Sequence, residues 1–231
     1  MSEKYIKFFE GFALAYGVAD MSTLKVDPES GKQKPDYRWN DEKLTEQVYL
    51  NHLAGTQSIG VQPCNEDSNA RFGVVDVDPK NYTDFDKKFF IDIIQNYNLP
   101  LIPVLSKSGG LHLYLFMADF VPAALIKSFL SNLLPLFKLK PDCEIFPKQT
   151  QLTKDNETGQ LNKGNFINLP YFKKSERLAI NLDGTAFSFD QFIAVVESNT
   201  VNAEDLKNLT QSIEEKDLEG VDEEFDDGPP C

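Results

Sequence analysis

The sequence predicts an α+β fold, and three observations lead to that class. Between residues 72 and 147, short apolar and β-branched runs of strand length alternate with segments of helical periodicity. Of the 231 residues, 41% are hydrophobic, with 18 Phe and 8 Tyr, which is enough for a buried core. No apolar run approaches the ~18 residues that a membrane span requires. We therefore expect a folded domain, and neither a disordered chain nor a membrane protein.

The charge and the cysteines narrow the class further. The net charge is −13, and residues 213–231 hold nine acidic residues and one basic residue. Any contact with nucleic acid must therefore come from a local basic patch. Cys64, Cys143 and Cys231 are too widely spaced for a disulfide framework or a CxxC metal motif. Because no secretory signal is visible either, we expect a reducing, cytoplasmic setting.

An α/β module is expected at the N-terminus. Residues 3–16 have apolar side chains at helical spacing and predict a helix. Residues 20–38 are polar and contain Pro and Gly, which predicts a loop. A second helix is expected over 42–53, with His52 as a packing or surface residue, and a short strand is expected at 59–62.

Six elements are expected in the centre of the chain, in the order strand, helix, strand, strand, helix, strand. They cover residues 72–77, 83–96, 101–105, 111–117, 122–137 and 142–147. Pro103 predicts an edge strand, and Pro122 lies in the first turn of its helix. The tight turn SKSGG, at 106–110, joins the second and third strands. This order is that of the ferredoxin-like, or RRM-like, unit.

Beyond this unit the sequence predicts a polar loop over 150–163, a strand at 165–169 and helices at 188–197 and 203–213. We expect residues 213–231 to be a solvated acidic linker, truncated from a longer protein. The rest of the chain is expected to form one folded domain. Its parts are an N-terminal module at 1–70, an RRM-like module at 71–172 and a C-terminal helical part at 173–212, which together make up residues 1–212.

Acidic side chains and one histidine are expected to meet at one end of the central sheet. In a ferredoxin-like sheet the first and third strands are neighbours and the fourth flanks the first, and side chains two residues apart share a face. Asp76 and Asp78 therefore project together from the end of the first strand. His112 begins the antiparallel third strand beside them. Asp142 and Glu144 are expected to share a face of the fourth strand.

These carboxylates predict a metal site. Clustered carboxylates repel one another unless a cation compensates them. Asp76, Asp78 and a third acid suit Mg²⁺ or Mn²⁺, and two such ions can clamp the attacking and leaving oxygens of a phosphoryl displacement. For the DVD motif alone, the alternative is a pair of solvated acids at a strand end. Both acids interrupt an otherwise apolar central strand, which favours the metal site.

The turn before His112 predicts a phosphate-binding loop. Its two glycines, of which Gly110 is the second, allow close backbone approach. The hydroxyls of Ser106 and Ser108, the ammonium group of Lys107 and exposed N–H groups suit a triphosphate. His112 could donate to phosphate oxygens. A simple hairpin turn also needs glycine and remains the alternative.

Three sequence blocks occur in a fixed order over residues 71–172: RFGVVDVD, SKSGGLHLYLF, and CEIFPKQ with the downstream GNFINLPYF. With these blocks the sequence resembles the archaeo-eukaryotic primase superfamily, in particular the primase-polymerases of phages, plasmids and mobile elements. The first block resembles the acidic first motif of that family, the second its Ser-x-His-type motif, and the third its last acidic strand. The combined set is specific, whereas any one block is weak.

The resemblance implies a template-dependent nucleotidyltransferase, a DNA primase or DNA polymerase that serves DNA replication. Such an enzyme joins an NTP or dNTP to a 3′-hydroxyl with two Mg²⁺ or Mn²⁺ ions and releases pyrophosphate. The implied partners are the nucleotide, a single-stranded DNA template with its primer, and a helicase or other C-terminal domain in a longer protein. The implied setting is the cytoplasm of a bacterial or phage-infected cell.

The resemblance also assigns roles to individual residues. The implied metal ligands are Asp76, Asp78 and Glu144, and the implied phosphate contacts are His112 and Ser106 or Ser108. Asp142 has the same parity as Glu144 and is the alternative third ligand. Glu144 is favoured because it lies further inside the strand.

Further contacts are expected from residues around the motifs. Lys148 and Lys107 are expected to face the nucleotide, and Asn165 to orient it. The expected contacts to template phosphates, whose binding should weaken with salt, are Arg71, Lys163, Lys173 and Lys174. For each base taken singly, an ordinary surface position remains the alternative.

Two other functions remain open. A rolling-circle Rep or relaxase-like endonuclease also uses a ferredoxin-like sheet and a metal. It needs a His-hydrophobe-His pair and a nucleophilic tyrosine, whereas this strand reads His112-Leu113-Tyr114 with a single histidine. A non-catalytic RRM-like nucleic-acid-binding module would stack bases on aromatic residues, where this chain has Asp76 and Asp78. The fold alone does not decide between these functions.

Overall fold

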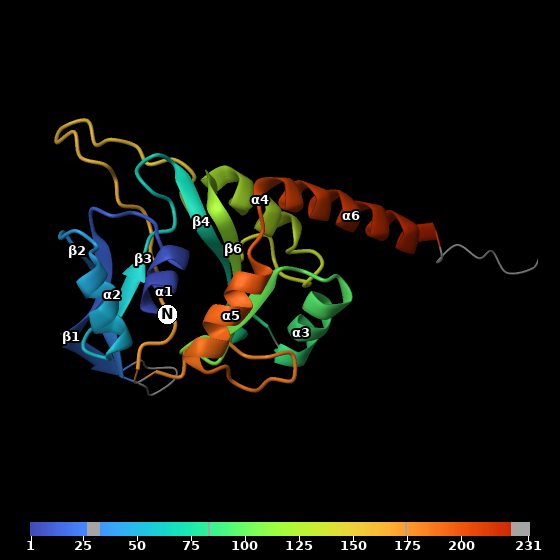
Figure 1. Cartoon of the computed structure of the whole chain (residues 1–231), viewed down its shortest axis with the longest axis horizontal. Helices are drawn as coiled ribbons and strands as arrows, with labels where there is room; N and C mark the ends of the chain where they lie inside the picture. The colour runs from blue at the N-terminus through green and yellow to red at the C-terminus, as the bar shows by residue number, and fades with distance from the viewer. Residues whose placement is uncertain (27–32, 83, 174, 223–231) are drawn as a thin grey trace, which may run out of the picture.

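The computed structural model describes residues 1–231 except 27–32, 83, 174 and 223–231, and it has a mixed α+β architecture (Figure 1). Its described residues form two four-stranded antiparallel sheets and six α-helices. The α+β class expected from the sequence is therefore confirmed. Among the described helices, none is both long and apolar enough to cross a membrane.

The N-terminal sheet has the strand order β2-β1-β3-β8. Its strands are β1 (Tyr16–Val26), β2 (Gln33–Asn40), β3 (Ile59–Val61) and β8 (Ile167–Asn168). The expectation of a loop over 20–38 is wrong, because β1 and β2 pair antiparallel across this segment. The two strands lack the alternation of apolar and polar residues that predicts a strand. Ion pairs between them, such as Lys25 with Asp36 at 2.7 Å, help to hold them together.

The first helix, α1 (Ser2–Phe8), is shorter than the helix expected over 3–16. At Gly11 the chain runs so close to Gln62 that a Cβ atom would lie 2.2 Å from the Gln62 carbonyl oxygen. The chain has therefore left the helix there to pack beside β3. Phe12 is still buried, so the apolar spacing of this segment reflects core packing outside a helix.

The second sheet has the strand order β5-β6-β4-β7. Its strands are β4 (Asn69–Val77), β5 (Leu101–Leu105), β6 (Leu111–Pro122) and β7 (Glu144–Phe146). The sequence predicted that the first strand lies between the third and the fourth, and the pairing of β4 with β6 and β7 confirms this. The strand containing Pro103 ends the sheet order, as expected.

Short helical segments connect these strands. A 3₁₀ turn (Pro79–Asn81) follows β4 and leads to α3 (Lys87–Asn96), and α4 (Ala123–Asn132) follows β6. Both helices are shorter than expected. The side chain of Asp86 caps α3 by accepting from the Lys88 N–H at 2.9 Å, which sets the start of that helix.

The second sheet has a hydrophobic core on each face. On one face, strand residues such as Val75 pack with residues of α3 and α4 such as Phe90. On the other face, Tyr114 packs with Phe9, at the end of α1, with ring centroids 5.7 Å apart. Because side chains alternate along a strand, Asp76 lies on this second face, where the N-terminal module covers the sheet.

The chain ends in two helices, α5 (Phe189–Asn199) and α6 (Ala203–Asp222), and α6 projects from the body (Figure 1). The helix expected over 203–213 continues to Asp222, so the first residues of the expected acidic linker are helical. Glu, Lys and Leu, which are good helix formers, occupy residues 214–216, 218 and 219, and Leu206 near the start of α6 is buried in the core. The rest of the expected linker, including Cys231, lies outside the described residues.

His52 lies near the end of α2 (Glu46–Leu53) and is fully buried, as the packing alternative predicted. Its Nδ1 accepts a hydrogen bond from the Ile59 N–H at 3.1 Å, so Nε2 carries the proton and donates to the Pro170 carbonyl at 2.8 Å. The neutral ring therefore ties α2 to β3 and to the chain after β8. Burial lowers the pKa of His52 to about 4.

We expect His52 to make the protein less stable in acid. Its pKa is about 4 in the folded state and 6.5 without the fold, so the unfolded state takes up the proton first. The free energy of unfolding should fall as the pH drops from about 6.5 to about 4, by up to about 3 kcal/mol. Urea unfolding at several pH values measures this loss. Because His52→Gln lacks the titration, parallel pH curves for the variant and the wild type would contradict the prediction.

Candidate active site

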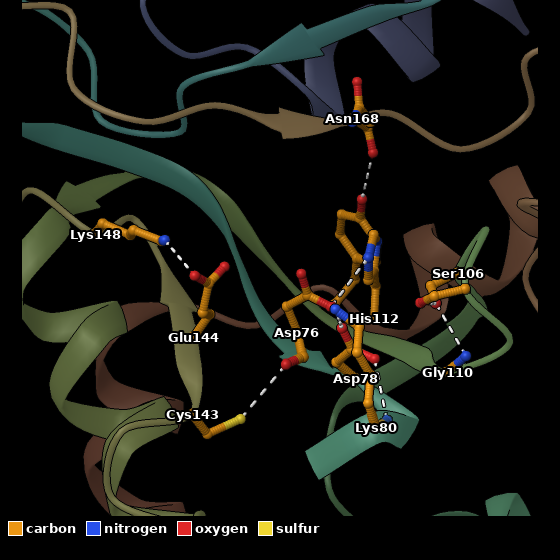
Figure 2. Close-up of polar contacts among 12 residues, drawn as sticks. Asp76, Asp78, Lys80, Ser106, Gly110, His112, Cys143, Glu144, Lys148 and Asn168 are labelled. Carbon is orange, nitrogen blue, oxygen red and sulfur yellow. Dashed lines mark hydrogen bonds and ion pairs between the residues drawn. The ribbon is translucent and has the colours of Figure 1, made fainter. Parts of the chain in front are cut away.

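Asp76 lies at the centre of the candidate site, near the end of β4. The strand register sets it opposite His112 of β6 on one side and opposite Glu144 of β7 on the other. Directly opposed residues of an antiparallel pair have their side chains on the same face. His112 Nε2 lies 3.3 Å from Asp76 Oδ1, and the two side chains meet in Figure 2. Asp76, His112 and Glu144, which we expected to lie close together, are therefore neighbours on one face of the sheet.

Asp78 follows β4 and begins the 3₁₀ turn. Its carboxylate accepts a hydrogen bond from the Lys80 N–H at 3.2 Å, which caps the turn, and it pairs with Lys80 Nζ at 2.9 Å. Pro79 has no N–H to continue the strand ladder. Asp78 and Asp76 nevertheless line the same cavity.

The two candidates for the third acid occupy different positions. Glu144 pairs with Asp76 in the sheet, whereas Asp142 lies in the turn before β7. The expectation that both share a face of the strand is therefore wrong, because β7 begins only at Glu144. Glu144 forms an ion pair with Lys148 Nζ at 2.7 Å. Between the two acids, the Cys143 thiol donates to the main-chain carbonyl of Asp76 at 3.5 Å.

The four carboxylates line one polar cavity of about 420 Å³. Its walls are formed by Asp76, Asp78, Lys80, Asn81, Tyr82, Lys140, Asp142, Cys143 and Glu144. Burial raises the pKa of Cys143 to about 11 and that of Tyr82 to about 12, so both are neutral near pH 7. Among the described residues, no three His, Cys, Asp or Glu side chains form a ready cluster of metal ligands. Asp76, Asp78 and Glu144 are instead paired with His112, Lys80 and Lys148.

The loop between β5 and β6 adds polar groups at the same end of the sheet. Ser106 Oγ lies 2.9 Å from Ser108 Oγ and accepts a hydrogen bond from the Gly110 N–H at 3.0 Å. The main chains of Ser106 and Gly110 also bond to each other and close the loop. Lys107 and Ser108 are exposed at its tip. Ser106 therefore orders the loop, and the exposed residues present its polar groups.

Gly110 packs directly against the end of β4. A Cβ atom at this position would lie 2.1 Å from the carbonyl oxygen of Val77. We expect Gly110→Ala to push the loop and the strand end apart and to lower the free energy of unfolding by about 1–3 kcal/mol. Chemical denaturation measures the change, with Ser108→Ala as the control in the same loop. An unchanged denaturation midpoint for Gly110→Ala would show that this close approach is not a constraint.

Side-chain amides hold Asn165, the residue expected to orient the nucleotide, and the sequence did not point to the buried Gln62 among them. Gln62 is fully buried, and its Nε2 donates to Gln149 Oε1 at 3.1 Å. Gln149 Nε2 donates to Asn165 Oδ1 at 2.7 Å, and Gln149 Oε1 accepts from the Asn165 N–H at 2.9 Å. The exposed Asn165 is thus held by Gln149, and the buried Gln62 at the end of β3 holds Gln149 in turn. The only signal in the sequence was a polar residue at the end of a short apolar strand.

The bases expected to contact nucleic acid fall in different environments. Arg71 is buried near the start of β4, away from Asp76, where acidic and carbonyl groups surround its guanidinium. Lys163 forms an ion pair with Asp41. Lys173 is exposed, and Lys174 lies outside the described residues. Of the described bases, Arg71, Lys163 and Lys173 do not line the cavity of the carboxylates.

Comparison with known proteins gives the family of the chain. A family model described as "TOTE conflict system, Archaeo-Eukaryotic Primase domain" matches residues 22–220. The chain belongs to this primase family. The match includes every motif block, so the resemblance to the archaeo-eukaryotic primase superfamily is confirmed. Among solved structures, the chain is similar to one titled "Crystal structure of primase RepB'". The two share 13% sequence identity with a TM-score of 0.34, and the match covers 96% of this chain and 67% of that one. No curated protein matches the primase domain.

Proposed function

We propose that this primase domain is a template-dependent nucleotidyltransferase that acts as a DNA primase or DNA polymerase. It joins an NTP or dNTP to a 3′-hydroxyl and releases pyrophosphate. The observation that carries the proposal is the register that sets Asp76 between His112 and Glu144, with Asp78 on the same cavity. Carboxylates from separate segments around one polar cavity suit the transfer of a charged phosphoryl group.

The donor set fits Mg²⁺ or Mn²⁺. Both ions take oxygen ligands, and the acids that line the cavity offer carboxylate oxygens from two segments of the chain, the end of β4 and the start of β7. Asp76, Asp78 and Glu144 would hold the ions, with Asp142 as the alternative to Glu144. When bound, such ions lower the pKa of the attacking hydroxyl and neutralise charge on the triphosphate.

The other residues bind and orient the nucleotide. The ring of His112 is buried and held by Asp76, which supports a fixed contact to the phosphates. Lys107 and Ser108, exposed at the tip of the loop that Ser106 orders, bind the triphosphate in this proposal. Asn165, held by Gln149, orients the nucleotide. These contacts fix the α-phosphate for in-line attack, and positioning of this kind supplies much of the rate of phosphoryl transfer.

Contacts to the template are proposed for exposed bases. Lys173 is exposed and Lys163 is partly exposed, so both can reach template phosphates, although Lys163 must first leave Asp41. Arg71 is buried and would need to move. We also propose that a helicase or other C-terminal domain in a longer protein works together with this domain.

Incubation with labelled dNTPs or NTPs and a primed single-stranded DNA template tests the proposal. We expect template-dependent products only when Mg²⁺ or Mn²⁺ is present. A covalent adduct between a tyrosine and DNA would instead indicate a Rep-like or relaxase-like endonuclease. Binding of DNA without any chemistry would indicate a nucleic-acid-binding module.

A further inference from the structure

Each of the three favoured metal ligands is paired with a base of the protein itself (Figure 2). The pairs are Asp76 with His112 at 3.3 Å, Asp78 with Lys80 at 2.9 Å and Glu144 with Lys148 at 2.7 Å. Carboxylates gathered around one cavity repel one another, and nearby cations offset that repulsion. Lys80 and Lys148 therefore offset part of the negative charge, and in the described structure each of the three carboxylates already has a partner in the protein.

Lys148 is the more firmly placed of the two lysines. Its side chain is 29% exposed, compared with 63% for Lys80. Its Nζ lies 5.2 Å from the centroid of the Phe146 ring, within range of a cation–π contact. Its carbonyl accepts a hydrogen bond from Lys127 Nζ, which ties the residue to α4. Because its backbone is anchored and its ammonium group is partly buried, it competes for Glu144 better than a fully exposed lysine does.

A divalent ion at this cavity has to compete with the Lys148 ammonium for Glu144. The ion carries twice the charge and gathers several oxygen ligands, so it can replace a single ammonium contact. An ammonium group on a flexible four-carbon stem can then turn to another anion nearby. A nucleotide bound at the same cavity offers that anion as its phosphates.

We propose that Lys148 is an exchangeable counter-ion: it occupies Glu144 in the metal-free domain and moves to the nucleotide phosphates when the metal binds. This inference rests on the proposed function. It predicts effects of opposite sign for one substitution, because Lys148 opposes the metal and favours the nucleotide.

The first measurement is the affinity for Mn²⁺ alone, from the electron paramagnetic resonance signal of free Mn²⁺. We expect Lys148→Met to bind Mn²⁺ about fivefold more tightly than the wild type, because a competing cation is gone. Lys140→Met is the matched control, since it removes the same charge from the wall of the same cavity without removing a partner of Glu144. We expect it to change the affinity by less than about twofold.

The second measurement is the affinity for a non-hydrolysable dATP analogue at saturating Mn²⁺, by isothermal titration calorimetry. We expect Lys148→Met to weaken nucleotide binding by about fivefold, and Lys148→Arg to restore it to within about twofold of the wild type. Circular dichroism checks that the variants fold.

The two measurements separate this inference from the proposal on which it rests. Equal Mn²⁺ affinity in Lys148→Met and Lys140→Met overturns the exchange, and so does unchanged nucleotide affinity in Lys148→Met. If the wild type binds no Mn²⁺ at all, the proposed function itself fails.

Discussion

Asp76→Asn is expected to reduce nucleotide incorporation by at least about 100-fold, because it removes charge at the point where the phosphoryl group is transferred. Asp76 lies in the central strand, opposite His112 of β6 and Glu144 of β7. No other acid occupies this position between the two strands. Asparagine has the same shape and can still accept a hydrogen bond from His112. The loss should therefore appear in kcat, with little change in the free energy of unfolding.

A surface acid provides the control for this variant. Asp92→Asn removes the same charge from α3, where Asp92 pairs with Lys88 on the helix surface. It is expected to leave incorporation unchanged. If Asp76→Asn retains more than about a tenth of the wild-type rate while Asp92→Asn behaves as the wild type, Asp76 is not at the reacting centre.

Glu144→Gln and Asp142→Asn are expected to differ sharply, and the pair identifies the third acid. Glu144 is in register with Asp76, whereas Asp142 lies in the turn outside the strand. We expect Glu144→Gln to lower kcat by about 100-fold or more and Asp142→Asn by less than about tenfold. Primer extension over a range of Mn²⁺ concentrations measures both variants. The reverse order of effects would assign the third position to Asp142.

Most of the second sheet could be predicted from the sequence. The apolar strand that carries Asp76 and precedes Asp78, the turn before His112 and the short strand of Glu144 each have a local signal in composition or glycine content. Their pairing followed from the expected strand order, and the register bears it out. Local signals were sufficient here because each strand is buried, so that hydrophobic patterning determines its face.

The N-terminal hairpin-like pair of strands could not be predicted in the same way. β1 and β2 are held partly by exposed ion pairs, such as Arg38 with Asp20, and their polar sequence resembles that of a loop. The length of α1 also depended on a distant contact, because Gly11 packs against Gln62. Long-range contacts of this kind leave no pattern in the local sequence.

In the candidate site, the residue types were predictable but their pairing was not. The sequence brought Asp76, His112 and Glu144 together through strand order. It did not reveal that Lys148 turns back onto Glu144, since that contact depends on the chain geometry after β7. It also did not reveal that Gln62 holds Gln149, the partner of Asn165, because 87 residues separate the two glutamines in the chain.

The most direct test of the account is a crystal structure with Mn²⁺ and a non-hydrolysable nucleoside triphosphate, using the anomalous scattering of manganese to locate the ions. We predict Mn²⁺ bound by Asp76, Asp78 and Glu144, with the triphosphate beside His112 and the loop that Ser106 orders. Manganese and nucleotide bound elsewhere in the molecule, with these carboxylates still paired to His112, Lys80 and Lys148, would contradict it.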